Sequence, residues 1–213
     1  MAESIDHLYA AEAPLAARIL TAAHRHLFEH GYAALTMDEL AHEIGVSKKT
    51  LYVHFSGKDA IVERIIDAIG ASLRVRMDGV LTDSSLTFPQ RVSGVVDVAG
   101  STLARLSPPL LRELQRYAPA IYRKLEELRQ KNIPYVFGKL IRSGIAEGRV
   151  RAEVDPAFAV EFWLHAIRGL VQPASLERTQ LTPRQTLEKA LNLFFSGLLT
   201  PAGRKDYEKY LAT

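Results

Sequence analysis

Apolar residues recur at helical spacing along nearly the whole chain, which predicts an all-α protein. Leu15, Ile19 and Leu27 fall on one side of a helix over residues 14–30, with Pro14 in its first turn and Gly31 just after its end. No segment alternates convincingly as a strand would, and there is no internal repeat or low-complexity tract. The pattern predicts about nine or ten helices in all.

A second and a third helix are predicted from capping signals. Thr36 and Glu39 have the spacing of a capping box, in which Thr36 accepts from the amide three residues on and Glu39 reaches back. This second helix should end at Gly45, a residue suited to a left-handed C-cap. Ser47 is then expected to cap a third, very short helix.

The remaining helical patterns are mostly longer. Ser56 is expected to cap a fourth helix, which runs from Lys58 to about Met77. Pro134 should kink a later one, because proline cannot donate the usual backbone hydrogen bond. The later patterns cover residues 89–106, 108–117, 120–147, 156–172 (capped by Asp155) and 183–199 (opened by Thr182 and Pro183).

The third helix has two chemically different sides. At 100° per residue, Leu51 and Phe55 share one side, while Lys49, Thr50 and Val53 share the opposite side. Two helices joined by a tight turn are typical of a helix-turn-helix that reads the major groove. In the third helix, Lys48 and Lys49 lie at the N-terminal end, where their positive charges are unfavourable to the helix dipole. Contact with phosphates or guanine edges would offset this unfavourable interaction. The alternative is a solvated surface helix.

The segment GYAALTMDELAHEIGVSKKTLYVHFSGKDAIV, residues 31–62, resembles the N-terminal domain of the tetracycline-repressor (TetR/AcrR) family of transcriptional regulators. The resemblance implies a three-helix helix-turn-helix DNA-binding domain over residues 1–57 and a larger helical ligand-binding and dimerisation domain over 58–213. It also implies a homodimer on a palindromic operator, with repression released by a small molecule. By the same resemblance, bases are contacted by Lys48, Lys49 and Thr50, and phosphates by Thr36, Ser47, Tyr52, His54 and Lys58.

The positive charge of the N-terminal region is concentrated in one short segment. Residues 1–60 hold five Lys or Arg against eight Asp or Glu, yet three of the five cations lie within 47–58, where there is no acid. The positive potential is therefore local, and non-specific DNA binding should be weak. A hydrophobic fraction of 47% and a charged fraction of 24% are ordinary for a soluble globular protein.

Several other protein classes are disfavoured by the sequence. The absence of cysteine excludes disulfides and thiolate metal sites. The acidic N-terminal segment does not resemble a signal peptide, and no apolar run is long enough to span a bilayer, so a cytoplasmic location is expected.

Two C-terminal patterns, residues 156–172 and 183–199, are apolar on more than one side. Such helices must be buried on more than one side, and a partner subunit is one way to do this. We therefore expect homodimerisation through these two helices. The alternative is that they are central helices of a monomeric bundle.

An effector pocket is expected among aromatic and polar residues of the C-terminal part. Residues 105–151 carry eleven Lys or Arg against four acids, which favours either an anionic ligand or a solvated basic face. Each candidate can also be an ordinary core residue. The candidates are Phe88, Tyr117, Tyr122, Tyr135, Phe137, Trp163 and His165.

The string HLFEH, from His26 to His30, matches the H-x-x-E-H pattern of a class of zinc peptidases. Against a peptidase, Glu29 and His30 close the helix next to Gly31, and no third ligand is indicated by spacing. With no phosphate loop, nucleophile elbow or paired carboxylates, neither catalysis, a metal nor a cofactor is expected. A constitutive or architectural DNA-binding protein without an effector stays open as an alternative.

Overall fold

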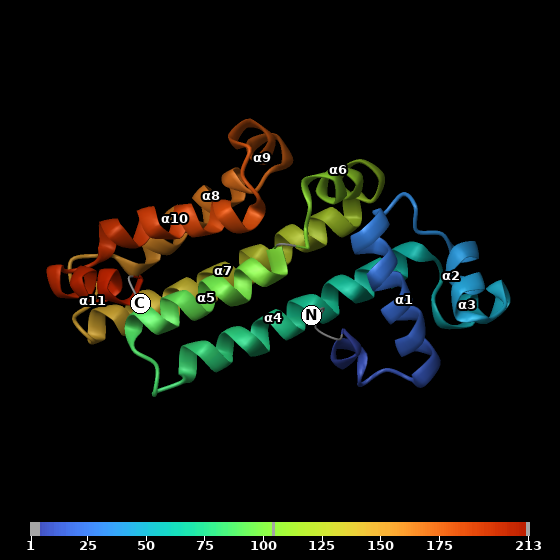
Figure 1. Cartoon of the computed structure of the whole chain (residues 1–213), viewed down its shortest axis with the longest axis horizontal. Coiled ribbons are helices and arrows are strands. Elements are labelled where there is room, and N and C mark those ends of the chain that lie inside the picture. Colours follow the sequence, from blue (N-terminus) through green and yellow to red (C-terminus); the bar gives the residue numbers. More distant parts are fainter. Residues whose placement is uncertain (1–4, 104, 212–213) are drawn as a thin grey trace. The chain divides into compact units, whose positions relative to one another are not determined.

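A computed structural model describes residues 5–103 and 105–211, and most of them are helical (Figure 1). The described residues contain no strand, and their one β-type pairing is an isolated bridge between Val150 and Leu199. No described helix is long and apolar enough to cross a membrane. The elements are η1 (Asp6–Tyr9), α1 (Pro14–His30), α2 (Met37–Ile44), α3 (Lys48–His54), α4 (Lys58–Thr82), α5 (Phe88–Leu103), α6 (Pro108–Tyr117), α7 (Pro119–Ala146), α8 (Pro156–Leu170), α9 (Pro173–Thr179), α10 (Pro183–Leu198) and α11 (Pro201–Leu211).

The first three helices have the predicted bounds, and the fourth begins at Lys58 as predicted but differs in its cap and in its C-terminal end. The first turn of α4 is closed by the Ile61 amide donating to the carbonyl of Gly57 at 3.4 Å. Gly57 therefore occupies the cap position that was expected for Ser56. At its other end α4 runs past Met77 to Thr82.

Two further observations concern Pro134 and the helices with weak apolar patterns. Helix α7 continues past Pro134 to residues such as Phe137 and Leu140, which are buried. The expected kink at Pro134 stays a prediction. Helices α9 and α11 were not predicted. Helix α9 has only seven residues and α11 is mostly polar, so neither carries a clear amphipathic repeat.

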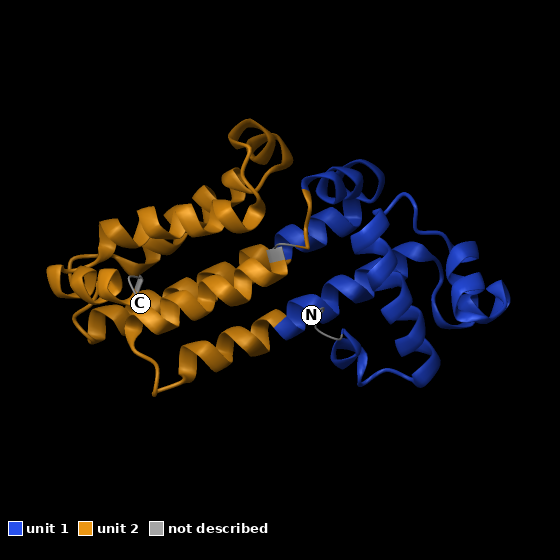
Figure 2. Ribbon diagram, in the orientation of Figure 1, with its two compact units in different colours: residues 1–72, 108–127 blue, residues 73–107, 128–213 orange. Residues whose placement is uncertain are grey.

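The described residues fall into two compact units (Figure 2). The first lies within residues 1–72 and 108–127, and the second within 73–107 and 128–213. Helices α4 and α7 each contribute residues to both units. The functional boundary expected between residues 57 and 58 stays a prediction.

The core of the second unit is an aromatic cluster. The ring centroids of Phe137 and Trp163 are 4.7 Å apart, and those of Trp163 and Phe194 are 5.0 Å apart. Phe88 and Phe195 complete the cluster, with centroids 6.1 Å apart. Rings at these separations fill space against one another and add to the hydrophobic stabilisation of the unit.

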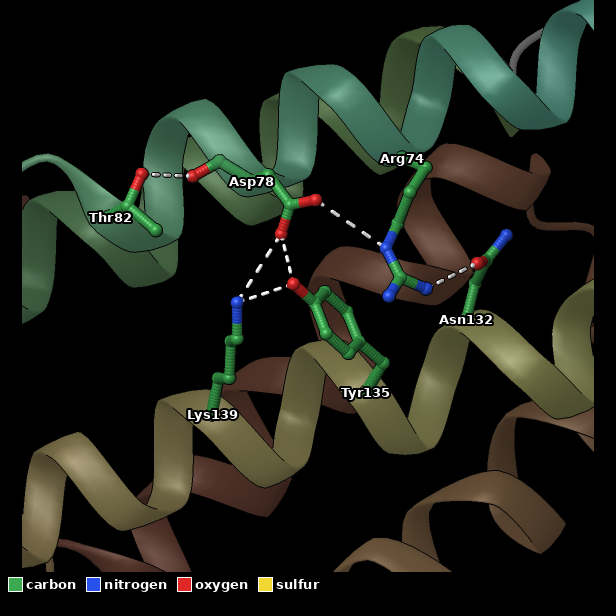
Figure 3. Close-up of polar contacts among 6 residues, drawn as sticks. All are labelled: Arg74, Asp78, Thr82, Asn132, Tyr135 and Lys139. Carbon is green, nitrogen blue, oxygen red and sulfur yellow. Dashed lines mark hydrogen bonds and ion pairs between the residues drawn. The ribbon is translucent and has the colours of Figure 1, made fainter.

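A polar network also joins α4 to α7 inside the second unit (Figure 3). The Tyr135 hydroxyl donates to the carboxylate of Asp78, and the Lys139 ammonium donates to the Tyr135 oxygen and, at 3.4 Å, to Asp78. The Arg74 guanidinium lies 3.2 Å from the centre of the Tyr135 ring and donates to Asn132. The hydrogen bond from Tyr135, followed by the charges of Lys139 and Arg74, lowers the pKa of Asp78.

Candidate nucleic-acid interface

Helix α2 begins and ends where its sequence predicts. The Thr36 side chain accepts from the Glu39 amide at 3.2 Å, which caps the helix. The Glu39 carboxylate accepts from the Thr36 hydroxyl at 2.9 Å instead of reaching the Thr36 backbone, so the expected capping box is only half formed. Gly45 ends the helix with a φ of 71°, a left-handed conformation that glycine adopts without strain.

Helix α3 follows after a tight turn and is held by one apolar side. The Ser47 side chain accepts from the Thr50 amide at 3.1 Å, and the two hydroxyls lie 2.8 Å apart. Leu51 is fully buried, and Phe55, which follows the last helical residue, is half-buried. The inward side predicted from the helical wheel is therefore confirmed.

The other side of α3 faces away from the protein. Lys49 is exposed, Tyr52 is 53% exposed and Val53 is 76% exposed. His54 is also exposed, and Thr50 is half-buried. An exposed cation beside exposed apolar and hydrogen-bonding side chains is the composition expected of a surface that contacts base edges and phosphates.

The lysines of this region differ in their partners. Lys48 forms an ion pair with Asp38 in the first turn of α2. Lys58 is half-buried, and its ammonium donates to the carbonyl of Tyr32 at 3.3 Å and lies 4.1 Å from the centre of that ring. Among the described residues, Lys49 has no hydrogen-bond or ion-pair partner. It is therefore the lysine most available to a polyanion.

The turn between α1 and α2 is held from two directions within the first unit. Tyr32 is buried and donates its hydroxyl to Asp59 of α4, and burial, together with that carboxylate, raises the pKa of the phenol. From α6, the Glu113 carboxylate accepts from the Ala33 amide at 2.9 Å. A Cβ atom on Gly31 would lie only 2.8 Å from a carboxylate oxygen of Glu113. These contacts fix the loop that leads into α2.

The structure adds two residues to the predicted interface. Asp38 lies beside Lys48, and Val53 is the most exposed large apolar side chain of the first unit. The helical wheel placed Val53 on the outer side, and its exposure confirms that position. Nothing in the spacing of Asp38 and Lys48 indicates their contact, because it depends on how α2 and α3 pack.

The candidate effector residues do not form one group. Phe88, Phe137 and Trp163 lie in the aromatic core of the second unit, while Tyr135 belongs to the polar network on α4 and α7. His165 is exposed and bonded to Glu161 at 2.8 Å. Tyr117, which is 56% exposed, and the half-buried Tyr122 belong to the first unit instead.

The H-x-x-E-H string does not assemble a metal site. The Nε2 atom of His26 lies 3.9 Å from a carboxylate oxygen of Glu39, and the Nε2 atom of His30 lies 3.8 Å from a carboxylate oxygen of Glu29. Within residues 5–103 and 105–211, no three His, Cys, Asp or Glu side chains are grouped so that they could hold a metal ion. The string gives no structural support to the peptidase alternative.

Comparison with known proteins identifies the N-terminal helices. Residues 19–65, which include α2, α3 and the turn between them, match the family described as bacterial regulatory proteins, tetR family. The chain belongs to the TetR family. This confirms the resemblance seen in the sequence, and a TetR-family chain with this helix-turn-helix is a DNA-binding transcriptional regulator.

Relatives of this TetR-family chain match it over most of its length. The uncharacterized HTH-type transcriptional regulator YvaF of Bacillus subtilis (strain 168) is 25% identical over 181 residues, which are 85% of this chain and 94% of YvaF. The HTH-type transcriptional repressor DhaR of Mycobacterium sp. (strain GP1) is 21% identical over 178 residues, 80% of this chain and 85% of DhaR. The regulator FadR from Bacillus subtilis, solved in complex with stearoyl-CoA, shares the fold with a TM-score of 0.62 at 21% identity, covering 85% of this chain and 98% of FadR.

Proposed function

We propose that this regulator is a homodimeric repressor that binds a palindromic operator and is released from it by a small molecule. The observation that carries the proposal is the orientation of α3, with Leu51 buried and Lys49 exposed. A recognition helix needs this arrangement, because it must be anchored on one side and free to enter the major groove on the other.

Each predicted contact has a chemical role in this proposal. Lys49 donates to guanine O6 and N7, which distinguish guanine from the other bases in the major groove. Tyr52 and His54 donate to phosphate oxygens, which fix the register of the helix without reading sequence. Thr36 and Ser47 cap α2 and α3, and in this proposal they contact phosphates near the helix N-termini.

Lys48, Thr50 and Lys58 were predicted as DNA contacts but have intramolecular partners in the free chain. Lys48 is paired with Asp38, and the Thr50 hydroxyl is bonded to Ser47. Lys58 is engaged with Tyr32, so it also positions the start of α4. We propose that Lys48 and Thr50 reach bases only when these partners are shared or exchanged.

An apolar groove on the second unit supports the dimer. The groove is lined mainly by side chains of α8 and α10, and three of them are largely exposed although they are apolar: Phe158 at 71%, Phe162 at 57% and Leu193 at 80%. Exposed apolar surface of this kind marks a protein interface. Two helices from each of two chains would cover it as a four-helix bundle, and the dimer would present two recognition helices to two half-sites.

The dimer is tested with two matched substitutions. Leu193→Glu places a charge in the groove and is expected to give monomers by size-exclusion chromatography with light scattering. Val75→Glu, at an apolar residue that is 72% exposed on α4 and does not line the groove, should leave the dimer intact. Dimers from both variants, or a monomeric unsubstituted chain, would contradict this interface.

We place the effector in the second unit, whose interior is rich in aromatic side chains. FadR, which shares the fold, was solved with stearoyl-CoA, a ligand with a long apolar chain and an anionic head group. An effector of mixed apolar and anionic character would suit both the aromatic core and the basic residues of α7. Trp163 is the one tryptophan of the chain and lies in this core, 1% exposed. Its fluorescence is expected to change when such a compound binds.

The DNA-binding function is tested by selecting duplexes from a random pool with the purified full-length chain. We expect palindromic sequences with half-sites about one helical turn apart. Lys49→Ala should change the selected sequence, whereas Tyr52→Phe should weaken binding to all duplexes alike. A uniform loss from both variants contradicts the assigned roles. If no compound in a cell extract releases the bound duplex, the chain is a constitutive DNA-binding protein instead of a ligand-released repressor.

A further inference from the structure

The ion pair between Asp38 and Lys48 places a carboxylate at the edge of the candidate DNA-binding surface. Asp38 lies in the first turn of α2, and Lys48 is the first residue of α3. Both side chains stay in water, at 69% and 54% exposed. Such a pair contributes little to stability. Its importance lies in where the negative charge is.

A carboxylate at this position opposes binding to phosphate. DNA binds proteins without regard to sequence mainly through lysines and arginines that neutralise phosphates, and each neutralised phosphate releases counterions. Lys48 can neutralise a phosphate fully only if it leaves Asp38. The unpaired carboxylate would then lie close to the phosphate backbone and repel it. Both effects weaken a complex that depends on phosphate contacts alone.

In a complex with the correct bases, Lys48 does not have to leave Asp38. An ammonium group has three N–H donors, so Lys48 can donate to guanine O6 or N7 while it keeps its contact with Asp38. The carboxylate then remains paired with Lys48, and this pairing offsets its repulsion of the phosphates. The cost of Asp38 is therefore smaller in the correct complex than in an incorrect one.

We propose that Asp38 is a specificity-determining residue, which weakens sequence-independent binding by holding Lys48 and by repelling phosphate. The proposal rests on the proposed DNA-binding function, because it requires that α3 faces the duplex. It accounts for an acid that contacts the recognition helix of a DNA-binding protein.

The acid has a second possible role, which a control must separate. A negative charge in the first turn of a helix favours the helix dipole, so Asp38 can also stabilise α2. Glu43 lies on the same helix and pairs with Arg25 of α1, not with α3. Glu43→Gln therefore removes an equal charge from α2 without touching the recognition helix, and thermal unfolding of each variant reports any loss of folding.

The experiment measures DNA affinity as a function of salt for the full-length chain. The unsubstituted chain, Asp38→Asn, Glu43→Gln, Lys48→Gln and the double variant of Asp38 and Lys48 are titrated with two duplexes. One duplex is selected from a random pool by the unsubstituted chain, and the other has the same composition in scrambled order. Affinities are measured from about 50 to about 200 mM salt.

Asp38→Asn should tighten binding to the scrambled duplex by about tenfold at the lowest salt, and by clearly less for the selected duplex. Its slope of log affinity against log salt on the scrambled duplex should be steeper by about 0.9, which is an extra loss of about 3.5-fold over a fourfold rise in salt. Glu43→Gln should leave the slope unchanged. In the Lys48→Gln background the change of slope should disappear, because the cation that Asp38 holds is absent.

Two results would overturn the inference. An unchanged slope and an unchanged ratio of the two affinities in Asp38→Asn would show that Asp38 does not act on DNA binding. The same steepening in Glu43→Gln, or in the Lys48→Gln background, would show a general charge effect. These results leave the DNA-binding function standing. If the unsubstituted chain selects no duplex at all, the proposed function fails and this inference with it.

Discussion

Substitution of Gly31 by alanine should destabilise the first unit through two separate effects. Gly31 ends α1 with φ 92° and ψ 174°, a backbone conformation that is essentially restricted to glycine. Forcing a side chain into it costs of the order of 1–3 kcal/mol. The new Cβ would also lie 2.8 Å and 3.0 Å from the two carboxylate oxygens of Glu113. Glu113 would have to move and lose its bond to the Ala33 amide, which is worth about 1 kcal/mol.

Together these effects predict that Gly31→Ala lowers the free energy of unfolding by about 2–4 kcal/mol. Urea denaturation of the full-length chain, followed by far-ultraviolet circular dichroism, measures this change. In a Glu113→Ala background the same substitution should cost about 1 kcal/mol less, because the bond to Ala33 is already lost. A cost below about 0.5 kcal/mol would refute the backbone argument, and equal costs in the two backgrounds would refute the clash with Glu113.

Three further outcomes are expected. Leu51→Ala should lower the free energy of unfolding by about 2–5 kcal/mol and abolish DNA binding. Val53→Ala, on the exposed side of α3, should change the free energy of unfolding by less than about 0.5 kcal/mol. Similar costs for the two substitutions would contradict the orientation of α3. Because the folded pKa of Asp78 is lowered, the stability that its carboxylate contributes is present above the ordinary value of 3.8 and is lost as the pH falls through the lower folded pKa. Asp78→Asn should therefore destabilise the chain near neutral pH, and the gap in stability between the variant and the unsubstituted chain should shrink in stronger acid. A gap that does not depend on pH would argue against the network with Tyr135. Thr182→Ala should lower the stability measured by thermal unfolding by about 1 kcal/mol, because the Thr182 side chain accepts from the Gln185 amide at 3.2 Å in a complete capping box. An unchanged stability would show that α10 is held by packing alone.

The helix boundaries that the sequence predicted well are those with a local chemical signal. Thr36, Ser47 and Asp155 each cap the helix that follows them, and Gly45 has the left-handed conformation expected at a helix end. These signals act over three or four residues, so they survive in any tertiary context. The inward side of α3 was predictable for the same reason, because Leu51 and Phe55 are only four residues apart.

The features that could not be predicted depend on residues far apart in the chain. Glu113 and Ala33 are separated by 80 residues, and their contact requires α6 to pack beside the first helices. Helix α11 has little apolar periodicity. Its start is fixed by backbone contacts instead, where the Thr200 amide donates to the Arg149 carbonyl at 3.0 Å. A Cβ on Gly203 would lie 2.2 Å from that same carbonyl oxygen.

The aromatic residues proposed to line an effector pocket show a related limit. Residue type indicates that a side chain favours burial, but it does not indicate in which unit the residue lies. Trp163 and Phe137 meet in the core of the second unit, whereas Tyr117 is exposed in the first. Their common chemistry therefore did not predict a common location.

Because the first unit is built from two separated stretches of sequence, it does not correspond to one continuous piece of the gene. A fragment that ends at residue 72 lacks Glu113, and with it the bond to Ala33. It also lacks Lys124, whose ammonium lies 2.7 Å from Asp67 of α4. A truncated N-terminal fragment should therefore melt at a lower temperature than the same helices in the intact chain. Joining residues 108–127 to that fragment through a flexible linker should recover part of the difference.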